Sequence, residues 1–189
     1  MTTRRSGWAD WVLTSAVLVA VAAGFWGLRQ FSESGEARRR EESARVSRLV
    51  SLSLAGESAP VMVVMAGADS VSFPDSIQRP LLLYVRGPDC SACERMDEVM
   101  LEFLRTRRSD EPEVWVADEA GPRALRETFG GLAGAHVMQP AQPVVFARRY
   151  RIEQVPYLAL IDAEMRIQRV RVGFVRGFDA RTFLRADAP

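Results

Sequence analysis

The sequence contains no lysine, because all 25 basic residues of the 189-residue chain are arginine. This absence excludes chemistry that needs a lysine amine, such as Schiff-base catalysis or the phosphate contact of a P-loop. The basic residues are balanced by 24 acidic ones, which leaves a net charge of +1. So even a balance gives no electrostatic reason to expect nucleic acid as a partner.

Cysteine and histidine are also scarce: Cys90, Cys93 and His136 are the whole set. A disulfide between such close cysteines shuts a very small loop, which restricts the unfolded chain too little to hold a fold together. A structural zinc site needs four ligands, and these residues supply three. Redox chemistry is therefore the strongest use of the cysteine pair, and no cofactor or metal is predicted for it.

An uncharged apolar segment spans residues 11–28, and its 18 residues are close to the minimum for a helix that crosses a hydrocarbon core about 30 Å thick. Tryptophans lie towards both ends, where indole rings favour the membrane interface: Trp8, Trp11 and Trp26. We predict a tail at residues 1–10 and a transmembrane anchor at 11–28 that contacts the lipid bilayer. A signal peptide cleaved near residues 21–23 is the alternative, although the apolar run continues past that point.

Residues 29–58 carry many charges of both signs and predict a solvated linker. The linker can be helical, because Glu41 and Arg45 have the spacing of a helical ion pair. A folded domain is predicted at residues 59–189. Arginines are more frequent after the anchor than before it, and by the positive-inside rule alone this would place the domain in the cytoplasm.

Within the domain, short apolar runs predict strands at 61–65, 71–73, 81–85, 114–116, near 137, at 155–161 and at 167–172. Helices are predicted at 92–104, 122–129 and 142–150, with a last helix capped by Asp179. In the first of these helices the apolar residues share one face, and the charged residues, Asp97 among them, fall mainly on the other. Strands that alternate with helices predict an α/β fold.

The two cysteines lie where the strand at 81–85 gives way to the first helix. Ser91 and Glu94 have the spacing of a capping box, with Ser91 as the N-cap. Cys90 would then lie at the helix N-terminus, where unpaired N–H groups and the helix dipole lower the pKa of a thiol. We predict Cys90 as the nucleophile and Cys93, one turn further on, as the thiol that resolves the mixed disulfide.

Pro156 is the third candidate site residue, because it opens the apolar strand predicted at 155–161. Proline has no N–H to donate to a neighbouring strand, so it needs a special place in a sheet. With a cis Val155–Pro156 bond, the backbone here can lie against the cysteines and pair with an extended substrate.

Two segments carry a resemblance to a known family. Residues 81–93 resemble the active-site strand and loop of the thioredoxin superfamily, and residues 150–162, followed by Arg166 and Ile167, resemble its cis-proline strand and hairpin. The resemblance covers roughly residues 59–184 and is greatest to the membrane-tethered, TlpA-like redoxins. It implies a thioredoxin-like fold, a central mixed sheet flanked by helices, behind one N-terminal transmembrane helix.

The same resemblance implies a function. Cys90 and Cys93 would form the redox-active disulfide, and Pro156 would be the catalytic cis-proline. The chain would be a single-pass membrane protein whose domain faces the periplasm and exchanges thiols with protein disulfides, as a reductase rather than an oxidase. Its partners would be these client proteins and a membrane electron donor or acceptor, and cytochrome complex assembly is one setting in this branch.

The chain departs from the family's pattern at two acidic positions. The buried acid of a thioredoxin strand falls at Tyr84, and the acid that tethered reductases carry after the second cysteine falls at Met96. Asp89 and Glu94 are the candidate substitutes, although both are expected in solvent or at the helix cap. The direction of electron flow therefore stays open.

Two other functions also stay open. Cu(I) favours soft ligands, so Cys90, Cys93 and His136 would make an extracytoplasmic copper site on the same fold. A cysteine pair that is permanently oxidised would instead leave a redox-silent interaction domain.

Overall fold

The computed structural model describes residues 44–75, 77, 79–118 and 122–185, together with Trp26, Arg38, Glu41 and Glu42. The chain divides into two compact units, Met1–Glu42 and Ser43–Pro189, and the fold below is that of the second. None of the described helices is both long enough and apolar enough to cross a membrane. Except for Trp26, the predicted tail and the anchor predicted at residues 11–28 lie outside the described residues.

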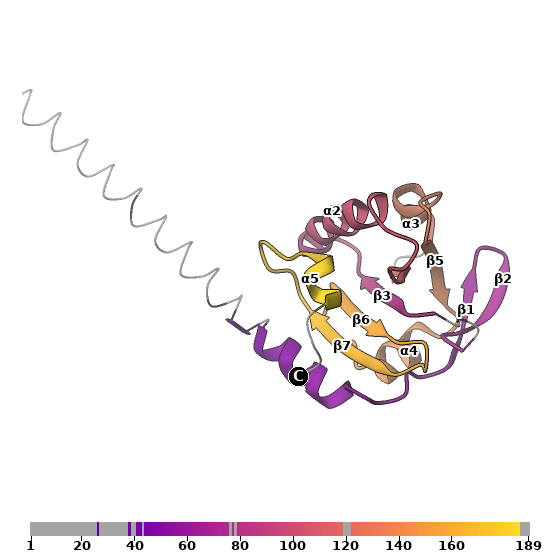
Figure 1. The fold of residues 1–189 in the computed structure, drawn as a ribbon, viewed down its shortest axis with the longest axis horizontal. Helices are drawn as coiled ribbons and strands as arrows, with labels where there is room; N and C mark the ends of the chain where they lie inside the picture. The colour runs from indigo at the N-terminus through magenta and orange to yellow at the C-terminus, as the bar shows by residue number, and fades with distance from the viewer. Residues whose placement is uncertain are drawn as a thin grey trace, which may run out of the picture. The chain divides into compact units, whose positions relative to one another are not determined.

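In the described part of the chain, a seven-stranded mixed sheet forms the centre of this unit (Figure 1). Its strands are β1 (Met62–Ala66), β2 (Asp69–Phe73), β3 (Leu81–Arg86), β4 (Glu113–Asp118), β5 (Ala135–Pro140), β6 (Tyr157–Ile161) and β7 (Ile167–Val172). Across the sheet the order is β2-β1-β5-β4-β3-β6-β7. The neighbours β3, β4 and β5 are parallel, and the other neighbouring pairs are antiparallel. The predicted α/β fold with a mixed central sheet is confirmed.

The helices follow the strands at the predicted places. They are α2 (Ser91–Arg105) after β3, α3 (Pro122–Phe129) after β4, α4 (Pro143–Arg149) after β5, and α5 (Ala180–Arg185) after β7. The predicted cap of the last helix is confirmed, because a carboxylate oxygen of Asp179 accepts a hydrogen bond from the N–H of Thr182 at 2.7 Å.

The sheet has an apolar core on each face, and this explains the continuous apolar run of β3. Leu81, Leu83 and Val85 belong to the core that includes side chains of α4. Leu82 and Tyr84 belong to the core that includes side chains of α2, α3 and α5. Because successive side chains of a strand point to opposite faces, a strand between two cores is buried along its whole length.

Residues 44–54 form a helix along β7, the edge strand of the sheet (Figure 1). The Ser47 hydroxyl accepts a hydrogen bond from the N–H of Val172 at 2.9 Å and donates one to its carbonyl at 2.8 Å. The Ser51 hydroxyl accepts one from the N–H of Val170 at 3.2 Å. The two serines thus satisfy backbone groups that an edge strand otherwise leaves to solvent. The sequence assigns these residues to the linker, and in the structure they pack on the domain.

Candidate functional site

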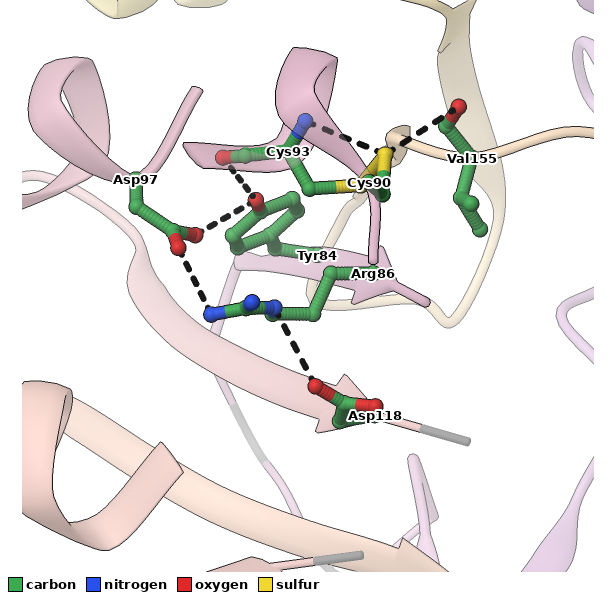
Figure 2. The surroundings of a disulfide bond; sticks show 7 residues. All are labelled: Tyr84, Arg86, Cys90, Cys93, Asp97, Asp118 and Val155. Atoms are coloured by element: carbon green, nitrogen blue, oxygen red, sulfur yellow. Dashed lines mark hydrogen bonds and ion pairs between the residues drawn. A yellow bond between two sulfur atoms is a disulfide. The ribbon is translucent and has the colours of Figure 1, made fainter. Parts of the chain in front are cut away.

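A disulfide joins Cys90 and Cys93 at the junction of β3 and α2 (Figure 2). Cys90 is the N-cap of α2, and its Sγ accepts a hydrogen bond from the N–H of Cys93 at 3.1 Å. The prediction of Ser91 as the N-cap, paired with Glu94, is wrong by one residue, because Ser91 is the first residue of the helix. The Cys90 sulfur therefore lies where a capping oxygen usually lies, in direct contact with a helix N–H.

The two cysteines differ in their access to solvent. Cys93 is 0 % exposed, whereas Cys90 is partly exposed. Cys90 is therefore the more accessible of the two residues, while Cys93 is covered by the protein. The two cysteines therefore already differ in solvent exposure in the oxidised protein.

The segment that precedes β6 lies against the disulfide. The Val155–Pro156 peptide bond is cis, and the carbonyl oxygen of Val155 is 4.0 Å from the Sγ of Cys90. Gly87 permits this approach, because a Cβ atom there would come within 3.1 Å of the Val155 side chain. The Pro156 carbonyl accepts a hydrogen bond from the N–H of Gly173 at 2.7 Å, which ties this loop to the end of β7. The structure thus places the residue before Pro156, the third predicted site residue, next to Cys90.

Four polar side chains form a network next to Cys93 (Figure 2). The hydroxyl of Tyr84 donates to Oδ1 of Asp97 at 2.7 Å and lies 3.2 Å from the carbonyl oxygen of Cys93. The guanidinium of Arg86 pairs with Oδ2 of Asp97 at 2.6 Å and with Asp118 at 3.1 Å. Tyr84 and Arg86 share a face of β3 because they are two residues apart, and Asp118 is the register partner of Arg86 on β4.

The charged groups of this network are largely buried. One guanidinium faces two carboxylates, and the side chains of Asp97 and Asp118 are only 11 % and 3 % exposed. Burial raises the pKa of Asp97, although the hydrogen bond from Tyr84 and the charge of Arg86 act in the opposite direction. Burial and the bond to the Asp97 carboxylate raise the pKa of Tyr84, which keeps its hydroxyl protonated as a donor. The surroundings of Cys93 therefore include a buried carboxylate whose pKa is raised.

The sequence predicts the acid near the cysteines at other positions. Asp89 and Glu94, the candidate substitutes, are both exposed. Asp97, assigned to the polar side of the helix by its periodicity, is instead buried, and it lies one helical turn after Cys93 on α2. The signal that finds it is a spacing of four residues from Cys93, because residues i and i+4 share one face of a helix.

His136, the third ligand of the copper alternative, has other partners. Its Nε2 is 3.1 Å from a carboxylate oxygen of Glu113, and its ring stacks on Trp115 with a centroid distance of 4.7 Å. Glu113 begins β4, whereas Asp118, which belongs to the network beside Cys93, ends it. Among the described residues, no group of three or more histidine, cysteine, aspartate or glutamate side chains is placed to hold a metal ion.

No protein-family profile and no curated protein sequence matches this chain. Solved structures do match its fold. The thioredoxin domain of a thiol-disulfide oxidoreductase from Bacteroides vulgatus aligns with a TM-score of 0.55 and 19% identity, over 69% of this chain and 94% of that one. A thiol:disulfide interchange protein from Bacteroides sp. aligns with a TM-score of 0.51 and 19% identity, over 61% of this chain and 80% of that one.

These similarities show that the unit has a thioredoxin-like fold, as the resemblance of residues 81–93 and 150–162 implied. They agree with the observed sheet, in which β3 leads directly to the cysteine pair at the start of α2.

Proposed function

We propose that the chain is a membrane-anchored thiol–disulfide oxidoreductase that acts on protein disulfides outside the cytoplasm. The observation that carries the proposal is the placement of Cys90. Cys90 is partly exposed, and its sulfur accepts a hydrogen bond at the start of a helix and borders the Val155 carbonyl, while its partner Cys93 is covered. A reactive cysteine needs both access and stabilisation of its thiolate, and this position offers both.

In the reduced protein, the Cys90 thiolate attacks one sulfur of a client disulfide. The client S–S bond breaks, a mixed disulfide forms, and the other client sulfur leaves as a thiolate. Cys93 then loses its proton and attacks the Cys90 sulfur, which restores the internal disulfide and releases the reduced client. The Asp97 carboxylate, one helical turn from Cys93, is the candidate acceptor for this proton, since its raised pKa suits a group that must take up a proton.

The buried Asp97 carboxylate near Cys93 supports reduction rather than oxidation of clients. A strong oxidant of this kind owes its potential to a stabilised thiolate in the reduced state. Here the carboxylate of Asp97 lies one helical turn from Cys93, and in its ionised form it disfavours a further negative charge nearby. We expect a reduction potential closer to the roughly −270 mV of a reductant than to the roughly −120 mV of a strong oxidant.

A pair of single variants tests the exchange reaction. Cys93→Ala leaves an accessible Cys90 that can attack but not resolve, so mixed disulfides with a disulfide-bonded client protein accumulate. Cys90→Ala leaves only the covered thiol, so almost none form. Non-reducing gels and mass spectrometry of the full chain read out both variants, with the double variant as the blank. Equal trapping by the two single variants would overturn the assigned roles, and trapping by neither would overturn the proposal.

A titration of the full chain against glutathione measures the potential of the Cys90–Cys93 pair. A cysteine pair that stays oxidised at every attainable ratio of reduced to oxidised glutathione would favour the redox-silent alternative instead. Cu(I) binding by the reduced protein, lost on His136→Ala, would favour the copper alternative.

The membrane anchor and the periplasmic site of action rest on the uncharged sequence of residues 11–28 and on the resemblance to tethered redoxins. A compartment-sensitive reporter fused after Pro189 tests them. Activity of a reporter that works only outside the cytoplasm is expected, together with extraction from membranes by detergent but not by alkali. A cytoplasmic reporter signal would overturn the proposed side of the membrane, and extraction by alkali would overturn the anchor.

A further inference from the structure

A second polar site lies away from the disulfide, at the β7 edge of the sheet. An open cavity of about 640 Å³ is lined by the helix of residues 44–54, β7, the loop that follows β7, and α5. Its volume is within the range of small-molecule binding sites, roughly 300–1,000 Å³. None of the residues of the disulfide site lines it.

The charge of this cavity is strongly positive. Four of its lining residues are arginines: Arg48, Arg169, Arg171 and Arg176. Asp179 is the one acid among the lining residues, and one of its carboxylate oxygens already accepts hydrogen bonds from the N–H and the hydroxyl of Thr182, each at 2.7 Å. The cavity therefore has cationic groups in excess of the anionic groups that line it.

Arg171 carries an enclosed polar atom that has no partner among the described residues. Its Nε is enclosed, and no group in the described part of the chain accepts a hydrogen bond from it. The Cζ atom of its guanidinium lies 4.7 Å from the ring centroid of Phe178. Burial lowers the pKa of Arg171, yet an arginine does not lose its proton in a protein, so a partly buried cation remains here with an Nε–H free to donate.

The groups around Arg171 indicate which kind of anionic ligand fits the cavity. Arg169 shares a face of β7 with Arg171, and its Nη1 donates to the carbonyl of Phe183 at 2.5 Å. Phe178 and Phe183 give the cavity an aromatic wall, and Leu52, on its rim, is 57 % exposed. A planar, forked guanidinium is the side chain best matched to the oxygens of a phosphate or carboxylate.

We propose that this cavity binds a phosphate-type oxyanion carried by a molecule with an apolar part, with Arg171 as the group that contacts the oxyanion. Arg48 and Arg176, both exposed at the mouth, attract the anion, and the aromatic wall holds its apolar part. The chemistry is shared by the head group of a phospholipid and by a soluble phosphate ester. The inference does not depend on the redox role of the cysteines.

Binding to the full chain in a neutral detergent tests the proposal by calorimetry. The probes are octyl phosphate, inorganic phosphate, and octyl glucoside as an uncharged control. Octyl phosphate is expected to bind saturably and about tenfold or more tightly than either of the others. Dihexanoyl phosphatidic acid, compared with dihexanoyl phosphatidylcholine below their micelle concentrations, separates the two sources: tighter binding than octyl phosphate assigns the site to a lipid head group, and weaker binding assigns it to a soluble ester.

Matched variants locate the binding. Arg171→Met keeps much of the length of the side chain and removes its charge, and it is expected to weaken octyl phosphate binding about tenfold or more. Arg176→Met, at the mouth, is expected to weaken it less and serves as the second variant if Arg171→Met does not fold. Arg123→Met, on the exposed surface of α3, is the control and is expected to change nothing. Absence of saturable binding, or binding that all three variants retain, would overturn the proposal.

Discussion

The disulfide site and the cavity beside β7 each contain a partly buried arginine, and the two arginines are treated in opposite ways. Arg86 is held by two carboxylates, Asp97 and Asp118, at distances of 2.6 and 3.1 Å. Arg171 faces an aromatic ring, with no ion pair to any described acid. A buried cation that has acidic partners within the chain is part of the scaffold. A buried cation that has no such partner is available to a ligand.

The charged groups at the two sites differ, although the net charge of the protein is only +1. The network beside Cys93 contains two carboxylates and one guanidinium, whereas the cavity is lined by four arginines and one aspartate. The near-neutral total therefore does not describe the charged groups at either site. The composition gives no reason to expect a highly charged partner for the whole surface. It says nothing about whether one region of the surface binds a charged ligand.

The largest expected effect is on stability, from Arg86→Met. The substitution removes the guanidinium that pairs with two buried carboxylates, and breaking such a buried pair costs about 3–5 kcal/mol. Chemical denaturation at pH 7 measures it, with Arg123→Met as the exposed control. A loss below about 1 kcal/mol would show that the network is solvated enough to do without its cation.

A smaller loss is expected from Tyr84→Phe. The variant keeps the ring in its core position and removes the hydroxyl that donates to Asp97 at 2.7 Å. Loss of a hydrogen bond to a charged group costs about 1.5–3 kcal/mol. Because this bond lowers the pKa of Asp97, the variant is also expected to raise that pKa further, as NMR titration of the carboxyl carbon can measure. An unchanged Asp97 titration would contradict the assigned contact.

Arg171→Met is expected to change the stability of the unliganded protein by no more than about 1 kcal/mol. It gives up a cation–π contact, worth roughly 0.5–1 kcal/mol, and also relieves an enclosed charge that has no described counter-ion. The same denaturation experiment measures it beside Arg86→Met. A loss as large as that of Arg86→Met would mean that Arg171 already has an anionic partner within the chain.

The smallest expected effect is a change in the pH dependence of stability, from Asp97→Asn. The pKa of Asp97 is raised in the folded protein, so its protonated form is favoured by folding. The stability linked to that proton is fully present below the ordinary aspartate pKa of about 3.9 and is lost as pH rises through the raised value. Asp97→Asn removes this decline, which unfolding free energies measured between pH 4 and 8 would reveal. Parallel curves for the two proteins would refute the shift.

The sequence was sufficient for those features that short stretches of chain determine. The strand–cysteine–helix order depends on the apolar run of β3 and on the periodicity of α2, and both are local. The last helix begins after Asp179 because a side-chain oxygen satisfies an N–H three residues away. The N-cap of α2 was misassigned by one residue because Ser91 is the usual capping residue type, whereas here the Cys90 sulfur accepts the bond.

Other features depend on residues far apart in the chain. The Val155 carbonyl reaches Cys90 across 65 positions, and the pairing of Arg86 with Asp118 follows from the register of β3 and β4. Ser47 and Ser51 look like solvated linker residues until β7 is placed beside them. Periodicity cannot reveal such pairings, because it contains no information about which elements become neighbours.

The sequence by itself therefore determined that a cysteine pair begins a helix after a buried strand, since spacing and apolar periodicity are properties of adjacent residues. The tertiary structure alone decided the electrostatics around that pair. Asp97 looked like one more acid on a polar helix face, and only the packing of α2 on β3 buries it beside Tyr84 and Arg86. The pKa of a carboxyl depends on burial and on the charges within a few ångströms, and those are known only once the elements are assembled.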